Sequence, residues 1–238
     1  MKPTWIAGSV LLGTALMAGC SERNTPTAVR NQPGIAFDAA SLTSVVTDPV
    51  GDAGWNENSG PGSLKKAPAW LDLASASVAL QGSRFLFAWD LAAPVPSDPA
   101  ADSAIPAHSD HVCIGRGLDT DPATAPVGYP NTQNESDPVE FYVALCWNPT
   151  GSFGLGTGFV GLLMDRRPLL AGDPAVVTQV DFHIDGQQVV IAVDAAALGE
   201  PATFAWVAFT EVANQADPND ARKILDFAPD AGLATWPQ

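Results

Sequence analysis

Two aspartates in the stretch RGLDTDPATAPVGYP, residues 116–130, are the first candidates for chemistry. Asp119 and Asp121 are one residue apart, so their side chains project to the same side of an extended backbone. Paired carboxylates on one side of a loop suit Ca²⁺, which takes about six to eight oxygen ligands in proteins. The Asp-Pro pair at 121–122 suits a simple turn equally well. The spacing alone leaves both interpretations, metal ligands and turn formers, open.

Tryptophans are the second group of candidates, because an exposed indole ring can stack on a sugar. Four of them lie near expected turns or strand ends, namely Trp55, Trp70, Trp147 and Trp236. The same rings are also suited to covering the ends of a β-sandwich. Trp89 and Trp206 fall inside expected strands, and we predict that both belong to the core.

Sequence motifs with a known catalytic mechanism are missing. The chain contains no Gly-x-Ser-x-Gly, His-Glu-x-x-His, Gly-Lys-Ser/Thr or Cys-x-x-Cys pattern. Its many aspartates could still supply the carboxylate pair of a glycoside hydrolase. We therefore assign no catalytic residue, and a carboxylate-dependent hydrolase stays an alternative to a non-catalytic protein.

The N-terminus predicts export and a lipid anchor. MKPTWIAGSVLLGTALMAGC begins with Lys2, continues with an apolar run and ends in small residues, as a secretory signal peptide does. Its last four residues resemble the bacterial lipobox, with Met17 where Leu is usual. The resemblance implies a signal peptide over residues 1–19 and acyl chains, palmitate among them, on Cys20. Ser21 resembles the outer-membrane sorting type, so we expect an envelope protein on the periplasmic or surface side of that membrane.

The mature chain divides into a tether and one domain. Residues 20–34 are polar and aperiodic, which predicts a flexible tether. Residues 35–238 are long enough for a single domain with a hydrophobic core. The formal net charge of −15 argues against nucleic acid as a partner. Acidity of this kind serves solubility, and a bound divalent cation would relieve part of the repulsion.

Period-two patterns dominate the domain. In SRFLFAWDL, residues 83–91, the apolar residues Phe85, Phe87 and Trp89 share one face of a strand. The preceding QGS predicts a hairpin connection, and Asp185-Gly186 predicts a type I′ turn between two strands. TFAWVAFTEV, residues 203–212, is apolar on both faces and predicts a central strand.

Helix is expected only in short turns. DAAALG, residues 194–199, predicts one helical turn with Asp194 as N-cap and Gly199 as the stop. Prolines punctuate the remaining segments and mark loops and strand ends. The sequence therefore predicts an all-β, jelly-roll-like antiparallel sandwich with short helical turns.

The cysteines that remain after Cys20 are Cys113 and Cys146. Each lies in an expected strand, and antiparallel pairing across the intervening loop would bring them together. Export makes a disulfide chemically possible. The bond would contribute about 3–4 kcal/mol in the chain-entropy model. We predict the disulfide over a pair of free thiols.

Four sequence pieces together resemble family 9 carbohydrate-binding modules and the related DOMON-like domains. The pieces are TDPVGD (47–52), APAWLDLASASV (67–78), GLDTDPATAPVGYP leading to EFYVAL (117–145), and DFAPDAG (226–232). The resemblance spans most of the mature chain, although an inserted APV between Thr124 and Gly128 departs from it. It implies structural Ca²⁺ and sugar binding between aromatic rings. The residues at matching places are Asp48, Asp52, Asp72, Asp119, Asp121 and Glu140.

The predicted function follows from these features. We expect a lipid-anchored, exported, non-catalytic β-sandwich that binds carbohydrate or another envelope or extracellular component, with Ca²⁺ as a stabilising ion. The alternatives are a glycosidase-like, carboxylate-dependent hydrolase and a structural subunit of an envelope assembly. The expected partners are the membrane, through the anchor, and carbohydrate or an envelope protein.

Overall fold

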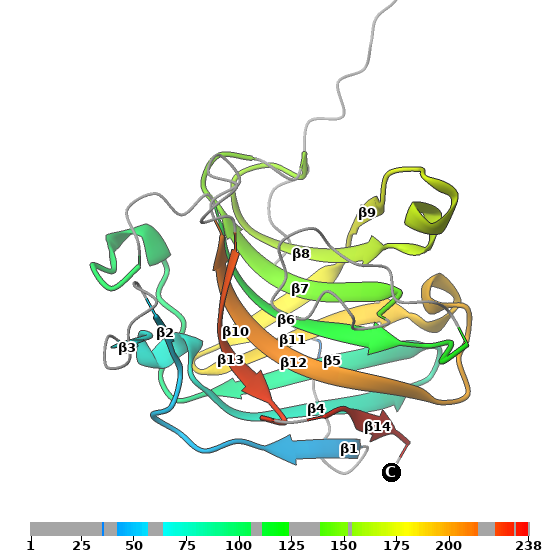
Figure 1. The fold of residues 1–238 in the computed structure, drawn as a ribbon, viewed down its shortest axis with the longest axis horizontal. Coiled ribbons are helices and arrows are strands. Elements are labelled where there is room, and N and C mark those ends of the chain that lie inside the picture. Colours follow the sequence, from blue (N-terminus) through cyan, green and yellow to red (C-terminus); the bar gives the residue numbers. More distant parts are fainter. Residues whose placement is uncertain are drawn as a thin grey trace, which may run out of the picture.

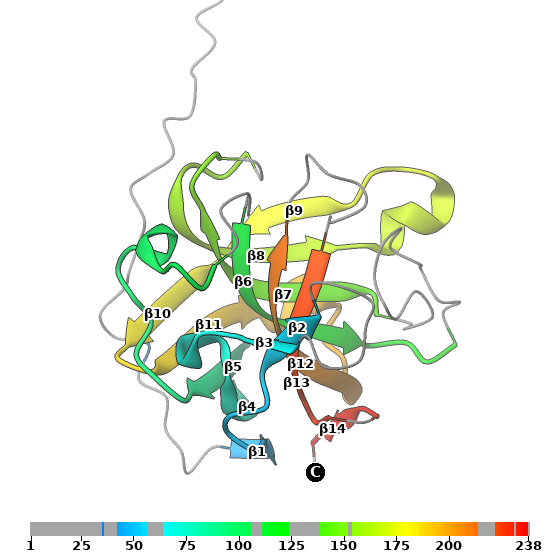
Figure 2. The same cartoon turned by 60° about the vertical axis from the view of Figure 1, so that its left-hand side comes forward.

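Two antiparallel β-sheets stacked face to face make up the computed structural model (Figure 1; Figure 2). The structure describes residues 35, 42–56, 64–105, 111–123, 139–151, 154–213, 222–230 and 232–237. The predicted all-β sandwich is confirmed. Cys20, the signal peptide and the tether lie outside the described residues, so their prediction stands untested.

The smaller sheet has five strands in the order β1-β4-β5-β11-β10. These strands are β1 (Leu42–Thr47), β4 (Leu73–Gln81), β5 (Arg84–Leu91), β11 (Gln188–Asp194) and β10 (Asp181–Asp185). The hairpin predicted at QGS connects β4 to β5, and Gly82 has the positive φ of 61° that its turn requires.

The larger sheet has the order β13-β12-β6-β7-β8-β9, with β14 pairing to β12 beside β13. Its strands are β13 (Arg222–Ala228), β12 (Phe204–Ala213), β6 (His111–Asp119), β7 (Phe141–Asn148), β8 (Gly158–Asp165), β9 (Val176–Gln179) and β14 (Ala234–Trp236). The predicted central position of residues 203–212 is confirmed, because β12 lies between β6 and β13.

Short elements lie in the connections between the strands of the two sheets. β2 (Gly54–Asn56) and β3 (Leu64–Lys66) form a small hairpin of their own. The described helical turns are 3₁₀ turns: η2 (Ala69–Leu71), η3 (Pro99–Ala101), η4 (Arg167–Ala171) and η5 (Ala195–Leu198). Among the residues that the structure describes, no helix is long and apolar enough to cross a membrane.

The core lies between the sheets. Phe85, Phe87 and Trp89 point into it as their alternation predicts, and Trp89 and Trp206 are fully buried. The Trp89 indole donates a hydrogen bond to the carbonyl of Gly115 across the core, at 3.0 Å. The sequence prediction of these two core tryptophans is thus confirmed.

A buried arginine crosses this core. Arg116 of β6 is fully buried, and its guanidinium lies 4.1 Å from the ring centre of Trp206 and 5.0 Å from that of Trp89. Its Nη1 and Nη2 donate to the carbonyls of Ser77 and Ala88 in the opposite sheet. Burial lowers the pKa of this guanidinium. Aromatic faces and carbonyls supply the negative potential that a buried cation needs.

The two sheets are joined at both margins. At one margin Val180 alone separates β9 from β10, so the chain passes from one sheet to the other within a single residue. Gly161 permits this passage, because a Cβ there would lie 2.6 Å from the Val180 carbonyl oxygen. At the other margin the Ser44 hydroxyl of β1 donates to the Thr235 carbonyl of β14, at 2.7 Å.

Two predicted turn details are corrected. β10 ends at Asp185, which pairs with Gln188, so the central turn residues are Gly186 and Gln187. Only Gly186 has a positive φ, as in a type II′ turn, and the predicted type I′ turn is wrong. Gly199 ends η5 as predicted, but the Asp194 side chain makes no cap hydrogen bond and pairs with Arg84 at 3.3 Å.

The predicted disulfide is present. Cys113 of β6 and Cys146 of β7 lie opposite one another in the ladder, with Cα atoms 4.1 Å apart. The bond lies on the outer face of the larger sheet, in an apolar patch with Ala144, Val160 and Leu162. Both the pairing of these strands and their register are therefore as the sequence predicts.

Candidate functional site

The loop after β1 begins the candidate site. Asp48 ends its strand by donating its backbone N–H to the Ala74 carbonyl of β4, at 3.0 Å. Gly51, with φ of 100°, turns the chain back, so that Asp52 returns toward Asp48. The N–H of Gly51 donates to Oδ2 of Asp72 at 2.7 Å, which fixes the loop against the start of β4. The sequence motif TDPVGD thus forms a tight carboxylate-bearing loop.

The opposite sheet contributes a carboxylate to the same place. Asp226 lies in β13, and its Oδ2 accepts the N–H of Leu73 from the five-stranded sheet at 2.7 Å. Its Oδ1 accepts the N–H of Phe227 at 2.9 Å. One carboxylate oxygen each from Asp48, Asp52 and Asp226 lie within 4.8 Å of one another. We call Asp48, Asp52, Asp72 and Asp226 the inter-sheet carboxylate cluster.

Burial works against ionisation in the inter-sheet carboxylate cluster. Desolvation, followed by the charges of Asp48 and Asp52, raises the pKa of Asp226 to about 8. Desolvation, followed by the charges of Asp230 and Asp52, raises the pKa of Asp48 to about 6, and a hydrogen bond with the Asp226 side chain opposes this rise. Desolvation also raises the pKa of Asp72, which the hydrogen bond from Gly51 opposes. The protein alone therefore does not fully compensate these negative charges.

Two buried carboxylate oxygens of the cluster have no hydrogen-bond donor. Asp48 Oδ2 and Asp72 Oδ1 are buried and have no hydrogen-bond partner, and the two residues are 9 % and 5 % exposed. A buried polar atom normally has a partner, and an unsatisfied one costs free energy. Asp48, Asp52 and Asp226 bring three carboxylate oxygens together, and two buried oxygens of the cluster lack a donor. Carboxylate oxygens are the ligands that a hard cation prefers. The residues of the inter-sheet carboxylate cluster therefore fit a Ca²⁺ ion.

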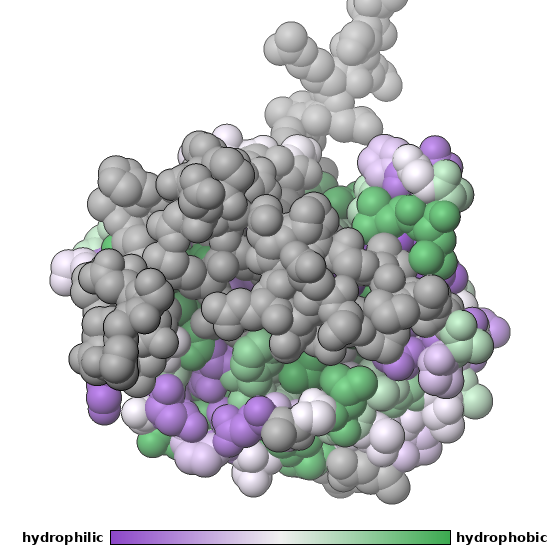
Figure 3. Space-filling model, viewed as in Figure 1, coloured by the Kyte–Doolittle hydropathy of each residue, from purple (hydrophilic) through white to green (hydrophobic). Residues whose placement is uncertain are grey.

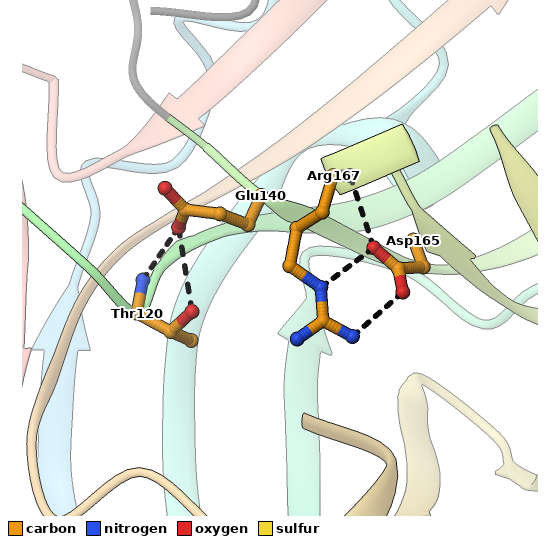
Figure 4. A network of polar contacts seen from close by, with 4 residues as sticks. All are labelled: Thr120, Glu140, Asp165 and Arg167. Atoms are coloured by element: carbon orange, nitrogen blue, oxygen red, sulfur yellow. Dashed lines mark hydrogen bonds and ion pairs between the residues drawn. The ribbon is translucent and has the colours of Figure 1, made fainter. Parts of the chain in front are cut away.

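Asp119, from the predicted Asp-x-Asp loop, and Glu140 form a separate acidic pair. Glu140 is 1 % exposed, and its Oε2 accepts the backbone N–H of Thr120 at 2.7 Å (Figure 4). Asp119 ends β6 beside it, and Asp119 Oδ1 and Glu140 Oε1 are both buried without a hydrogen-bond partner. Desolvation, followed by the charges of Glu140 and Asp121, raises the pKa of Asp119.

An arginine lies next to this acidic pair. Arg167 makes a bidentate ion pair with Asp165, in which Nε and Nη2 donate to the two carboxylate oxygens at 2.9 and 2.7 Å. This pair lies on the side of Glu140 away from Thr120 (Figure 4). The charge of Glu140 contributes to the raised pKa of Arg167, after the larger effect of Asp165. Arg167 thus places a positive charge near Glu140. The pKa shifts of the inter-sheet carboxylate cluster show no arginine in the same role.

Asp121, the second aspartate of the Asp-x-Asp pair, has the geometry of a turn residue. Its side chain is exposed, and its Oδ1 accepts the N–H of Ala123 at 3.0 Å, which is the geometry of an Asx turn. Among the described residues, Asp119, Asp121 and Glu140 do not bring three ligand atoms within 4.8 Å of one another. The six carboxylates expected to bind metal therefore belong to two places, and Asp121 acts as a turn residue.

The predicted stacking tryptophans are placed mostly in the interior. Trp70 is buried, and its indole donates to Asp102 at 2.9 Å. Trp236 is buried and stacks on Phe204 with centroids 5.2 Å apart. Trp147 is partly buried and packs edge-on against Phe159. Buried rings do not offer a face to a sugar, so the geometry of Trp70 and Trp236 does not support the stacking role predicted for them. The side chain of Trp55 lies outside the described residues.

Asp226 is the site residue that sequence reasoning missed. It lies in DFAPDAG, which the sequence analysis recognised as a motif without assigning a ligand to it. The available signal was an aspartate between apolar residues in a strand, which is uncommon unless the carboxylate has a partner. Its contact with Leu73, 153 positions away, could not be read from the sequence.

Figure 3 shows where polar and apolar surface gathers on one face. A hydrophilic area at the lower left lies where Figure 1 places the chain between β1 and β2, which carries Asp48 and Asp52. A hydrophobic area at the upper right lies over the segment from β8 through η4 to β9, where Leu170 and Val176 are exposed. The candidate cation site and this apolar area are therefore well separated.

Comparison with known proteins gave no match. No protein-family model, no curated protein and no solved structure matches the chain. The fold and the side-chain geometry therefore carry the functional argument.

Proposed function

We propose that the chain is an exported, lipid-anchored, non-catalytic β-sandwich binding module whose fold is stabilised by Ca²⁺ in the inter-sheet carboxylate cluster. The observation that carries this proposal is the pair of buried oxygens without donors, Asp48 Oδ2 and Asp72 Oδ1, beside Asp226 of the opposite sheet. A cation there would satisfy groups from both sheets and connect them.

The spacing of the oxygens is compatible with Ca²⁺. Opposite ligands of a Ca²⁺ ion lie about 4.6–5.2 Å apart, because each Ca–O distance is about 2.3–2.6 Å. The oxygens of Asp48, Asp52 and Asp226 lie within 4.8 Å of one another, which fits around one such ion. Ca²⁺ also tolerates irregular geometry, which suits ligands from a loop and a strand.

The arrangement of the motifs supports the resemblance to carbohydrate-binding modules. Asp48 and Asp52, Asp72, and Asp226 come from three of the four sequence pieces that carry the resemblance, and the fold brings these pieces together. We propose carbohydrate, or another envelope component, as the ligand. With Trp70 and Trp236 buried, Trp147 and Trp55 are the predicted stacking rings that remain for this role.

A carboxylate-dependent hydrolase is the second candidate, and one observation favours it. The pKa values of Asp226 and Asp48, about 8 and about 6, differ in the way that a proton donor and its partner differ in such enzymes. A hydrolase needs these carboxyls free of metal, whereas the proposed module needs them as ligands. Ca²⁺ binding and catalysis at the cluster therefore exclude one another.

The test replaces Asp226 by Asn. Asn can still accept the Leu73 N–H, so Asp226→Asn removes a charged ligand and keeps the shape. In the native protein we expect millimolar Ca²⁺ to raise the melting temperature by several degrees, because a ligand at a hundred times its Kd adds about 2.7 kcal/mol. Calorimetric melting with Ca²⁺ or a chelator measures this, and Asp226→Asn should remove the shift.

The control is Asp173→Asn, which removes the same charge from an exposed position away from the cluster. It should keep the full Ca²⁺-dependent shift. If chelation leaves the native melting curve unchanged, the cation proposal is wrong. Loss of glycoside hydrolysis in Asp226→Asn, with native activity unaffected by Ca²⁺, would favour the hydrolase instead.

A further inference from the structure

We propose that the outer face of the larger sheet holds a Zn²⁺ site that the Cys113–Cys146 disulfide closes and that reduction opens. The ligands are His111, Cys113 and Glu211, with Cys146 as a second sulfur. One ligand atom each from His111, Cys113 and Glu211 lie within 4.8 Å of one another. This site is distinct from the inter-sheet carboxylate cluster and does not depend on the proposed function.

The strand register builds this site. Glu211 of β12 lies opposite Cys113 of β6, which lies opposite Cys146 of β7. His111 is two residues from Cys113 on the same strand, so both side chains project from the same face. Neighbouring strands therefore present a carboxylate, a thiol group and an imidazole side by side.

The chemistry of these groups selects the metal. Imidazole nitrogen, thiolate sulfur and carboxylate oxygen are the donors of tetrahedral zinc sites. In such a site, zinc–ligand distances of about 2.0–2.3 Å place neighbouring ligand atoms about 3.3–3.8 Å apart. His111 Nε2 and Glu211 Oε1 are 4.0 Å apart, longer than a direct hydrogen bond and close to that span.

Burial strengthens the case for a metal. His111, Cys113 and Glu211 are all buried, beside an apolar patch that includes Val160 and Leu162. Ionisable groups are rarely buried unless they are paired or coordinate a metal. In the oxidised protein His111 Nε2 lies 4.0 Å from Glu211 Oε1, a contact that is an ion pair only when the imidazole is protonated. Zinc would supply a common partner for all three groups in the reduced protein.

The disulfide acts as the switch because the thiolate is the metal ligand. A dithiol reductant transfers two electrons and two protons to the Cys113–Cys146 bond, forming two thiols, and itself becomes a disulfide. Zn²⁺ then displaces the thiol protons and binds the thiolates. Oxidation of the two cysteines by a disulfide would release the metal again.

The test uses two variants that differ only in which sulfur remains. Cys146→Ser and Cys113→Ser each remove the disulfide and leave one free thiol, and the two positions are 4.1 Å apart at Cα. Only Cys113 belongs to the group of three ligands. Cys146→Ser should therefore bind Zn²⁺ without any reductant, at least about tenfold more tightly than Cys113→Ser.

Co²⁺ serves as the spectroscopic probe for zinc in both variants. Cys146→Ser should show sulfur-to-cobalt charge-transfer absorption that Zn²⁺ abolishes, and Cys113→Ser should not. Equal absorption in both variants, or none in either, would overturn the proposal. Because calcium has little affinity for sulfur, this outcome is independent of the Ca²⁺ proposal.

The native chain gives a second test that does not depend on the folding of the cysteine variants. The full protein is reduced with a phosphine, freed of it without oxygen, and titrated with Co²⁺ beside the oxidised protein. Only the reduced form should show the sulfur-to-cobalt charge-transfer absorption, which separates this site from cobalt held by carboxylates. Glu211→Gln should weaken binding by about 10–100-fold, while His183→Gln in the other sheet should not. Equal sulfur-to-cobalt absorption in oxidised and reduced protein would contradict the proposal.

Discussion

The carboxyl group of Asp226 is the residue-scale feature with the clearest consequence for stability. Desolvation and then the charges of Asp48 and Asp52 raise its pKa to about 8, from an ordinary value of 3.8. The folded state therefore holds a proton that the unfolded chain releases. Its contribution to stability is complete below about pH 3.8 and is lost as the pH rises through 8.

We therefore predict that the metal-free protein loses stability between pH 5 and pH 8. Asp48, with a pKa raised to about 6, acts in the same direction over the lower part of this range. Urea denaturation in a chelator at several pH values measures the free energy of unfolding. Millimolar Ca²⁺ should flatten the decline, because a bound cation replaces the proton as the compensating charge.

Asp226→Asn separates this effect from the general repulsion of an acidic chain. The variant should lose most of the decline above pH 6, because its side chain does not titrate. A decline of the same size in Asp226→Asn and in the native protein would show that the cluster does not cause it.

Residue types predicted only part of the candidate site. Asp48, Asp52 and Asp72 were identified from their motifs, and the structure groups them. Asp119 and Asp121 were placed on one side of a loop by their spacing, but Asp121 makes an Asx turn instead. Spacing describes neighbours on one strand, whereas the inter-sheet carboxylate cluster depends on Asp226, which arrives from the other sheet.

At the scale of elements, the passage from β9 to β10 depends on close backbone contact. Val180 donates its N–H to the Gly161 carbonyl at 3.0 Å, and a Cβ at Gly161 would lie 2.6 Å from the Val180 carbonyl oxygen. We predict that Gly161→Ala costs about 1–3 kcal/mol of unfolding free energy, because backbone must move. Urea denaturation measures the loss.

Gly117→Ala is the matched control for this prediction. It lies in β6 of the same sheet, and a Cβ there would come 3.2 Å from the Val139 side chain, which can shift more easily than backbone. It should cost clearly less than Gly161→Ala. Equal costs would mean that the sheet passage does not set the penalty.

Strands and hairpins were predicted well because alternation and turn residues are local signals. The β6–β7 pairing followed from one further constraint, the position of Cys113 and Cys146. The sheet passage at Val180 was not predicted, and the hairpin turn was predicted one residue early and of the wrong type, since both depend on backbone register across strands. The burial of Trp70 and Trp236 was missed for a related reason, because rings near strand ends are covered only by tertiary packing.

At the scale of the whole molecule, the proposed lipid anchor on Cys20 would define where the domain acts. We predict that Cys20→Ser abolishes partition of the exported protein into detergent and into membranes. Each acyl methylene in the bilayer contributes about 0.8 kcal/mol, so loss of the chains removes the attachment. Detergent phase separation and labelling with a palmitate analogue measure it. Complete retention in the detergent phase would place the anchor elsewhere.

The two margins of the sandwich are joined by bonds of different kinds. Between β9 and β10 the connection is covalent and one residue long. At the other margin it consists of hydrogen bonds, from Ser44 of β1 to Thr235 of β14 and from Leu73 of β4 to Asp226 of β13. Local opening follows the weaker connection. Amide hydrogens of β1, β13 and β14 at the hydrogen-bonded margin should exchange with solvent before those beside Val180. The sandwich would then open first at the margin where the inter-sheet carboxylate cluster lies.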